Sequence, residues 1–441
     1  MGKNAEIILD INEKPNTSQW ISLSIPHLFA MFGSTVLVPL LVHLSPAVAL
    51  ASSGLGTLAY ILITRGKVPA YLGSSFAFIA PLISAKALGG PGAAMLGTFF
   101  AGIIYGLVAL LINKLGYRWL MRLLPPIVVA PVIIVIGLGL AGTAVGMAMY
   151  ENPGAPQADL IYSTKHIVVA LCTIAIIIIS STFFKGFFQL IPVLIGIIGG
   201  YIISVFAGLV DFSGVIEAKW FALPDFVFPF ISYEPTFSWQ VVMLMVPVAI
   251  VTLSEHIGHQ IVLSKVVNRD LVADPGLDSS LLGDGVSIVI ASLIGGPPTT
   301  TYGENIGVLA ITRAYSVYVI GGAGVLALAF SFIGKISALL SSIPTAVMGG
   351  VSIVLFGIIA ASGLRMLVEH KIDFADNRNL LISSVILVVG IGGAFIRFTE
   401  GFELSGMALA AILGVILNLV LPGRPTEDSD LDLFSEIENE Y

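Results

Sequence analysis

The chain has little charge and almost no cysteine. Of its 441 residues, 11% are Asp, Glu, Lys or Arg and 56% are hydrophobic, whereas soluble globular proteins carry about 25% charged residues. The single cysteine, Cys172, excludes an intrachain disulfide and argues against a thiolate metal site. This scarcity of charge excludes an ordinary soluble domain and predicts a protein embedded in a membrane.

Apolar stretches of membrane-spanning length recur along the whole chain. Examples are Ile167–Ile179, Ile191–Val210 and Leu380–Ile396 with their flanks. At roughly 20 residues per spanning helix, we expect about fourteen segments and therefore an all-α polytopic membrane protein. Residues 1–20 are polar, so we expect a cytoplasmic N-terminal segment and no cleavable signal peptide.

The basic residues predict the orientation in the membrane. If the N-terminus lies inside, fifteen of the twenty Lys and Arg residues fall on the cytoplasmic side. Both termini are then cytoplasmic and the number of spans is even, as in a multi-pass protein of the cytoplasmic (inner) membrane. The tail, 425–441, holds seven acidic residues and no basic one. We interpret it as a solvated tail rather than a docking element.

Two short polar interruptions lie deep inside the apolar runs, at 73–78 and 297–305. Irregular backbone at membrane depth persists only where it faces protein or a watery cavity. One such break in each half of the chain is typical of the binding site of a secondary transporter. The sequence after Pro126 also resembles that after Pro344, about half a chain away. Seven segments per half would place the second copy upside down, as a 7+7 inverted repeat.

Three ionisable residues lie in or beside apolar spans of the second half: Glu255, His259 and Glu304. A central charge costs roughly 2.5 to 3.5 kcal/mol even on the mildest insertion scales. Glu255 and His259 are spaced i, i+4, so they share a helix face and can exchange a proton. The alternative is a structural pair that holds two helices together. His256 points about 100° away from Glu255 on a helix, so we interpret it as a packing residue or as one that supports the site from behind. A zinc site that includes it is disfavoured, because no cysteine is near.

Glu304 stands near the start of an expected half-helix that runs from Gly303 to about Thr312. Free backbone N–H groups and the positive end of the helix dipole point into the break at that position. Carboxylates, backbone amides and aromatic rings together suit a small, flat, neutral heterocycle with several N–H donors. The opposing break supplies Ser74, Ser75 and the ring of Phe76, and Tyr302, in the same break as Glu304, supplies another ring. Taken singly, without the break, Phe76 and Phe78 are more readily explained as packing residues.

Four motifs carry a resemblance to a known family. Glu304-Asn-Ile-Gly-Val-Leu-Ala-Ile-Thr-Arg313 resembles the signature of the nucleobase–ascorbate transporter (nucleobase:cation symporter) family. Ser254-Glu-His-Ile-Gly-His259, the stretch Pro69–Phe78 and the stretch His27–Gly33 are similar to those of its bacterial uracil permeases. The likeness covers about residues 20–424.

This resemblance implies fourteen segments in a 7+7 inverted repeat, with short extended strands in segments 3 and 10. It also implies a core domain, a gate domain and a homodimer. The expected divisions are 1–20 (N-terminal segment), 21–122 and 239–340 (core), 123–238 and 341–424 (gate), and 425–441 (acidic tail).

The function implied by the resemblance is uracil–proton symport. The proton is then the coupling ion. The implied partners are the nucleobase, protons and membrane lipid. The resemblance implies no cofactor, metal, catalytic residue or nucleic acid. Glu255 and Glu304 would contact the base, His259 would support protonation, and Phe76 would stack on the ring. The pocket would also be lined by Ser34, Ser75, Tyr302 and Gly303, with Asn305 behind it.

Four alternatives stay open. The same machinery could carry a purine such as xanthine or uric acid, or an anion such as sulfate or bicarbonate. Two acids at the site argue against an anion, because they repel it unless protonated. An enzyme that uses Glu255 and His259 as acid and base is disfavoured, because no large polar domain or nucleophile motif accompanies them. A channel would not show saturable, gradient-dependent uptake.

Overall fold

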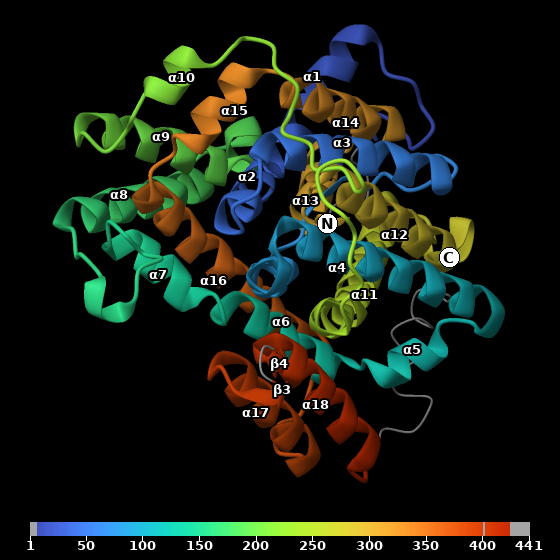
Figure 1. Cartoon of the computed structure of the whole chain (residues 1–441). Coiled ribbons are helices and arrows are strands. Elements are labelled where there is room, and N and C mark those ends of the chain that lie inside the picture. Colours follow the sequence, from blue (N-terminus) through green and yellow to red (C-terminus); the bar gives the residue numbers. More distant parts are fainter. Residues whose placement is uncertain (1–6, 400–401, 424–441) are drawn as a thin grey trace.

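The computed structural model describes residues 7–399 and 402–423, and the predicted acidic tail lies outside them. This part is built almost entirely from helices (Figure 1). Eight helical stretches are long and apolar enough to cross a membrane, as expected of an integral membrane protein. They are α1–α2 (Thr17–Ala30, Phe32–Leu41), α3 (Pro46–Ile63), η1–α4 (Phe76–Phe78, Ile79–Leu115), α6–α7 (Pro126–Leu138, Ala141–Met149), α8 (Thr164–Phe183), α11 (Trp239–Val267), η4–α12 (Val272–Gly276, Leu277–Ile294) and α16 (Thr345–Glu369).

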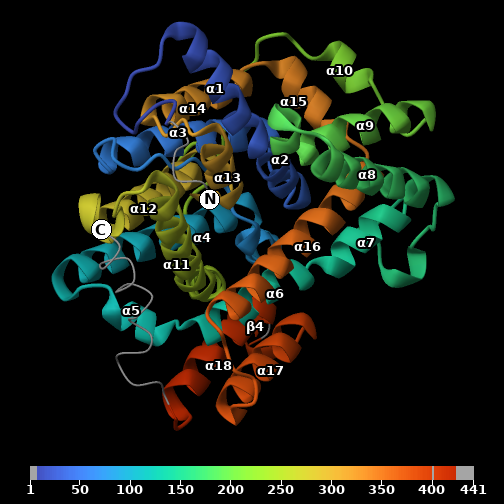
Figure 2. The ribbon, with the colours of Figure 1, turned by 180° about the vertical axis from the view of Figure 1, so that it is seen from behind.

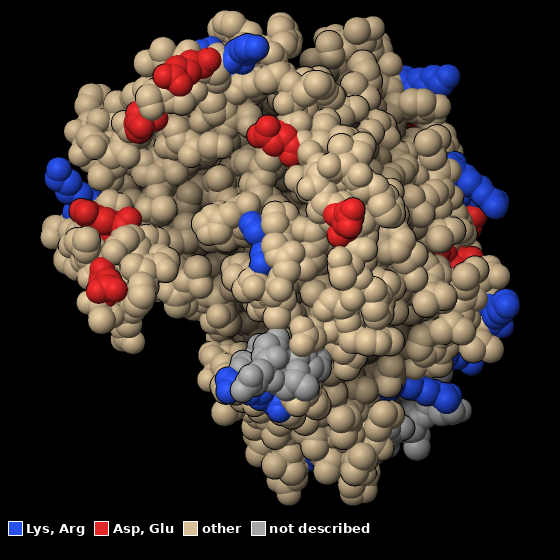
Figure 3. Space-filling model, viewed as in Figure 1, with Lys and Arg blue, Asp and Glu red and all other residues tan. Residues whose placement is uncertain are grey.

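Shorter elements complete the helical part. Four are apolar helices of 10–17 residues: α9 (Pro192–Phe206), α14 (Val317–Ser331), α17 (Asn377–Ile391) and α18 (Gly406–Val420). The others are α5 (Arg118–Leu123), η2 (Gln157–Asp159), η3 (Gly186–Leu190), α10 (Ser213–Glu217), α13 (Gly303–Thr312) and α15 (Gly334–Ser341). The face seen in Figure 3 shows only scattered charged residues on a mostly uncharged surface, as a lipid-facing protein requires.

The helices pack in two groups, which Figures 1 and 2 show from opposite sides. In one group α12 packs on α3 and α4, α14 on α3 and α1, and α11 on α4. In the other, α16 packs on α6, α7, α8 and α9, while α17 packs on α18 and α6. The site described below belongs to the first group.

Each predicted interruption contains all or part of a short extended strand, and the two strands pair with each other. β1 (Leu72–Ser74) and β2 (Thr299–Thr301) are antiparallel, with Gly73 opposite Thr300. The Ser75 amide donates to Pro298 O at 2.9 Å and the Tyr302 amide to Tyr71 O at 3.1 Å, which extends the ladder at both ends. Neither proline at 297 and 298 can donate a helix hydrogen bond, and Pro298 disfavours the helical conformation at Pro297, so both favour an extended chain there. The pair brings two breaks more than 220 residues apart into one place.

A helix begins directly after each strand. η1 and α4 follow β1, and α13 follows β2, with Tyr302 as an extended N-cap. The 37-residue α4 is itself interrupted at Gly89 and Gly90, where Gly90 takes φ +70°. Each strand therefore leads into a short half-helix whose N-terminus lies at the break.

Two predicted apolar segments end earlier than expected. The stretch Leu380–Ile396 was predicted to continue as a span, but α17 ends at Ile391 and the chain turns at Gly393, whose φ is +70°. Residues Phe395–Thr399 instead form β3, which pairs with β4 (Phe402–Ser405). Likewise α9 ends at Phe206, just before Gly208 with φ +71°. Positive φ is accessible to glycine and terminates a helix, which hydropathy alone does not reveal.

Candidate functional site

The two predicted acids lie near each other on neighbouring helices. Glu255 is half-buried on α11, and Glu304 lies in the first turn of α13 with its side chain exposed. Glu255 is within electrostatic range of Glu304. Gly258 on α11 and Gly307 on α13 lie on the same helix faces as the acids, and a Cβ on either would meet no atom within 4 Å. The helix faces that carry the acids are therefore not closed by packing at these two glycines.

His259 covers the junction of β2 and α13. Its Nδ1 lies 3.1 Å from Thr301 Oγ1, and its Nε2 lies 3.2 Å from the position that a Cβ on Gly303 would take. Among the described residues, no hydrogen bond joins His259 to Glu255, although both lie on one face of α11. The histidine is thus held by the break itself, with the Glu255 carboxylate one turn away.

Tyr302 fastens one break to the other. Its hydroxyl donates to Ser74 O, and its ring lies against Gly73. The Ser34 side chain also contacts the Tyr302 hydroxyl, and its own hydroxyl donates to Met31 O at 3.0 Å. Both Tyr302 and Ser34 are buried. Their side chains shape the site from behind.

Replacing Gly73 with Ala should destabilise the strand pair. The new Cβ would lie 2.7 Å from the Tyr302 ring and 2.9 Å from Thr35 Oγ1, so the cost should be about 1–3 kcal/mol, as for other overpacked sites. Thermal melting of the purified protein in detergent measures this. Gly142→Ala on α7 is the matched control, because nothing lies within 4 Å of its Cβ position. Equal melting temperatures for the two variants would show that the breaks are not packed as described.

Phe76 lies where the two groups of helices meet. Its half-buried ring contacts Phe356 of α16 edge-on, with centroids 6.0 Å apart and an interplanar angle of 87°. Phe78 is 1% exposed and belongs to the apolar core. Of the two rings, Phe76 is the one available to a ligand. Ser75 is buried beside it.

Asn305 lies behind the acids and links α13 to α1. Its Nδ2 donates to His27 O at 3.2 Å, and the residue is 1% exposed. This contact fixes the half-helix that carries Glu304.

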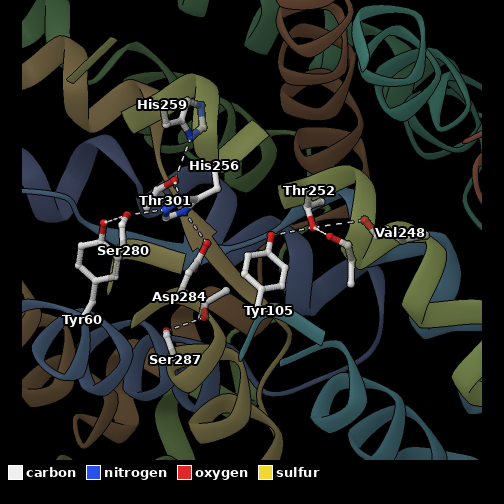
Figure 4. Close-up of polar contacts among 12 residues, drawn as sticks. Tyr60, Tyr105, Val248, Thr252, His256, His259, Ser280, Asp284, Ser287 and Thr301 are labelled. Atoms are coloured by element: carbon white, nitrogen blue, oxygen red, sulfur yellow. Dashed lines mark hydrogen bonds and ion pairs between the residues drawn. The ribbon is translucent and has the colours of Figure 1, made fainter. Parts of the chain in front are cut away.

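A buried polar network next to the site was not predicted from the sequence (Figure 4). Asp284 on α12 is fully buried, and its Oδ2 lies 2.8 Å from His256 Nδ1. The other ring nitrogen of His256 lies 2.6 Å from Ser280 Oγ, which lies 2.8 Å from the Tyr60 hydroxyl. His256 therefore pairs with a buried acid and is more than a packing residue.

The signal for Asp284 was present in the sequence. An acid between Gly283 and Gly285, inside a run otherwise apolar and small, marks a paired intramembrane charge. Thr301 joins this network to the site, because its Oγ1 lies 3.1 Å from His259 Nδ1 and 3.5 Å from His256 Nδ1. Within residues 7–399 and 402–423, no three or more His, Cys, Asp or Glu side chains are arranged to hold a metal ion.

The fold is that of a membrane transporter domain. It is similar to the transmembrane domain of a cyanobacterium bicarbonate transporter, BicA, with a TM-score of 0.60 and 14% identity over 92% of this chain and 98% of that chain. It is also similar to murine Solute Carrier 26 family member A9, an anion transporter, with a TM-score of 0.66 and 11% identity over 93% of this chain and 69% of that chain. At these identities the likeness shows the architecture alone.

Sequence comparison then places the chain among its relatives. Residues 18–398 match the Permease family. The chain is 64% identical to a uracil permease of Bacillus subtilis over 96% of this chain and 98% of the relative, and 62% identical to a uracil permease of Bacillus caldolyticus over 98% and 99%. A uracil permease of Escherichia coli K12 is 45% identical over 93% of each chain. The chain belongs to the nucleobase–ascorbate transporter family of permeases, and it is a transport protein rather than an enzyme.

Proposed function

We propose that this protein is a proton-coupled symporter that imports uracil across the cytoplasmic membrane. The observation that carries the proposal is the pair of intramembrane carboxylates, Glu255 and Glu304, on open helix faces beside two paired breaks. The high identity to uracil permeases over nearly the whole chain supports the choice of substrate.

The donor and acceptor groups of the site match those of uracil. Uracil is flat and neutral, with two ring N–H donors and two carbonyl acceptors. The carboxylates of Glu255 and Glu304 accept N–H groups, while free backbone amides at the start of α13, from Gly303 onward, donate to a carbonyl. The Phe76 ring stacks on one face of the base. Ser34, Ser75 and Tyr302 hold the surrounding backbone.

Proton coupling follows if uracil prefers one protonation state of the site. A proton on the cluster of Glu255, His259 and Glu304 removes the repulsion between the two carboxylates and favours the loaded, inward-moving state. Loss of that proton to the cytoplasm then allows the empty site to return. A substrate that bound the protonated and deprotonated states equally well could not shift the equilibrium between them.

Uptake of radiolabelled uracil into proteoliposomes should require an inward pH gradient. With the gradient imposed, uracil should accumulate, and a protonophore should reduce uptake to the level of facilitated exchange. Uptake that is unchanged by the protonophore would contradict the proton step while leaving uracil transport intact.

We also propose that the membrane part consists of fourteen segments in a 7+7 inverted repeat. The eight long helical stretches and the four shorter apolar helices are twelve segments. Counting α4 as two segments, divided at Gly89–Gly90, and β2 with α13 as one more gives fourteen, with strands in the third and tenth. The two packed groups of helices support a core and a gate with the predicted divisions. Both termini are cytoplasmic, and the protein is a homodimer.

An anion substrate is the alternative that the fold likeness to a bicarbonate transporter suggests. Two carboxylates at one site repel an anion, so uracil is favoured. Competition between labelled uracil and unlabelled candidate substrates distinguishes uracil from purines and anions. Unlabelled uracil should compete at low concentration, and xanthine, uric acid, sulfate and bicarbonate should not.

A further inference from the structure

An apolar groove of about 590 Å³ lies between α3 and α14, away from the uracil site. Its walls are formed by successive turns of α3 and α14 and by Trp20 of α1. The lining residues are Trp20, Leu58, Ile61, Leu62, Arg65, Gly66, Val317, Tyr318, Gly321, Gly322 and Val325. Its volume is within the range of small-molecule sites, about 300–1,000 Å³.

The groove runs along the two helices from a charged end to an apolar end. α3 and α14 are antiparallel here: the Cβ position of Gly66 lies 3.8 Å from Val317, and that of Gly321 lies 3.7 Å from Ile61. From Val317 to Val325 the groove extends about 12 Å, at 1.5 Å per residue. Beyond the charged end its lining is aliphatic and glycine, and Leu62 and Val325 are 78% and 44% exposed.

Cations and aromatic rings gather at one end only. Arg65 lines the groove just after the end of α3. Among the described residues, Arg65 makes no ion pair. Lys14 lies over the Tyr318 ring, 5.6 Å from its centroid. Trp20 Nε1 donates to Tyr318 O at 2.7 Å. The nearby Glu13 carboxylate accepts a hydrogen bond from the Asp10 backbone amide at 3.1 Å, which holds it against its own loop.

We propose that this groove binds one anionic phospholipid. Its acyl chain lies along the aliphatic floor between α3 and α14, and its phosphate lies against Arg65 and Lys14. The charge is complementary, and Trp and Tyr take the position they favour at a membrane interface. With the proposed orientation, the charged end lies at the cytoplasmic leaflet, where anionic lipids attract basic residues. The uracil site plays no part in this inference.

Two substitutions separate the head of the lipid from its tail. Arg65→Gln removes the charge without entering the groove. Gly321→Leu fills the groove, because a Cβ there meets only Ile61 and Leu58 at 3.7 and 3.9 Å, which is ordinary contact. Arg118→Gln on α5 is the matched control, since Arg118 is an exposed arginine that does not line the groove.

Native mass spectrometry of the purified full chain, titrated with phosphatidylglycerol or with phosphatidylcholine of the same acyl chains, tests the proposal. Wild type should retain phosphatidylglycerol more strongly. Arg65→Gln should weaken that binding about fivefold, the effect of one basic residue near an anionic surface, with phosphatidylcholine unaffected. Gly321→Leu should weaken both lipids, and Arg118→Gln neither.

Equal retention of the two lipids by wild type would overturn the proposal, as would unchanged phosphatidylglycerol binding by Arg65→Gln. A change in the dimer–monomer equilibrium of Gly321→Leu in lipid-free detergent would instead assign the groove to a second copy of the chain. If Gly321→Leu has a lower melting temperature than wild type, its lipid binding is set aside and the result for Arg65→Gln decides whether the groove binds an anionic lipid.

Discussion

Replacing Glu304 with Gln is expected to abolish gradient-driven uracil uptake and to weaken uracil binding about 10- to 100-fold. The substitution keeps the shape of the side chain but removes the charge that, in the proposed function, accepts a uracil N–H and takes part in coupling. A hydrogen bond to a charged group contributes about 1.5–3 kcal/mol, which gives a loss of this size. Equilibrium binding in detergent and uptake into proteoliposomes measure the two effects separately.

The matched control is Glu369→Gln, at the exposed end of α16. It removes the same charge from the protein without touching the site, and uptake should be unchanged. Full, gradient-coupled uptake by Glu304→Gln would remove that residue from the mechanism. Loss of coupling with retained uracil exchange would instead assign Glu304 mainly to the proton.

Replacing His256 with Ala is expected to have the largest effect on stability. Asp284 is fully buried, and the histidine is the partner of its Oδ2 and of Ser280. Without His256, Asp284 Oδ2 and Ser280 lose their partner, and leaving a buried polar group unpaired costs about 1–3 kcal/mol, more for a charged group. Denaturant or thermal unfolding in detergent should show the loss.

The double variant His256→Ala with Asp284→Asn provides the control for that result. Removal of the buried charge as well should restore part of the lost stability, since neighbouring residues in one network are not additive. A loss below about 1 kcal/mol in His256→Ala, the value of an exposed pair, would show that the pair is not buried as described.

Local features of the sequence were enough to find the two breaks and the two acids, one in the second break and one on α11. Consecutive prolines at 297 and 298 interrupt helix hydrogen bonding, and the glycine and serine residues at 73–75 weaken a helix, so both interruptions could be located without a structure. The i, i+4 spacing placed Glu255 and His259 on one helix face, and the half-helix at Gly303 followed from its position after the break.

Contacts between distant segments could not be found this way. The pairing of His256 with Asp284 joins two helices, and the Tyr302–Ser74 bond joins the two halves of the chain. Neither leaves a periodic pattern in the sequence. The ends of α9 and α17 were missed for another reason, because single glycines with positive φ stop helices inside runs that remain hydrophobic.

The number of protons taken up when uracil binds tests the central claim most directly. Calorimetric titrations in two buffers with different ionisation enthalpies give that number for wild type, Glu255→Gln and Glu304→Gln. We predict net proton uptake in wild type, an affinity that rises as the pH falls, and a smaller proton uptake in at least one variant. Binding without proton exchange at every pH, or identical proton uptake in all three proteins, would contradict the account.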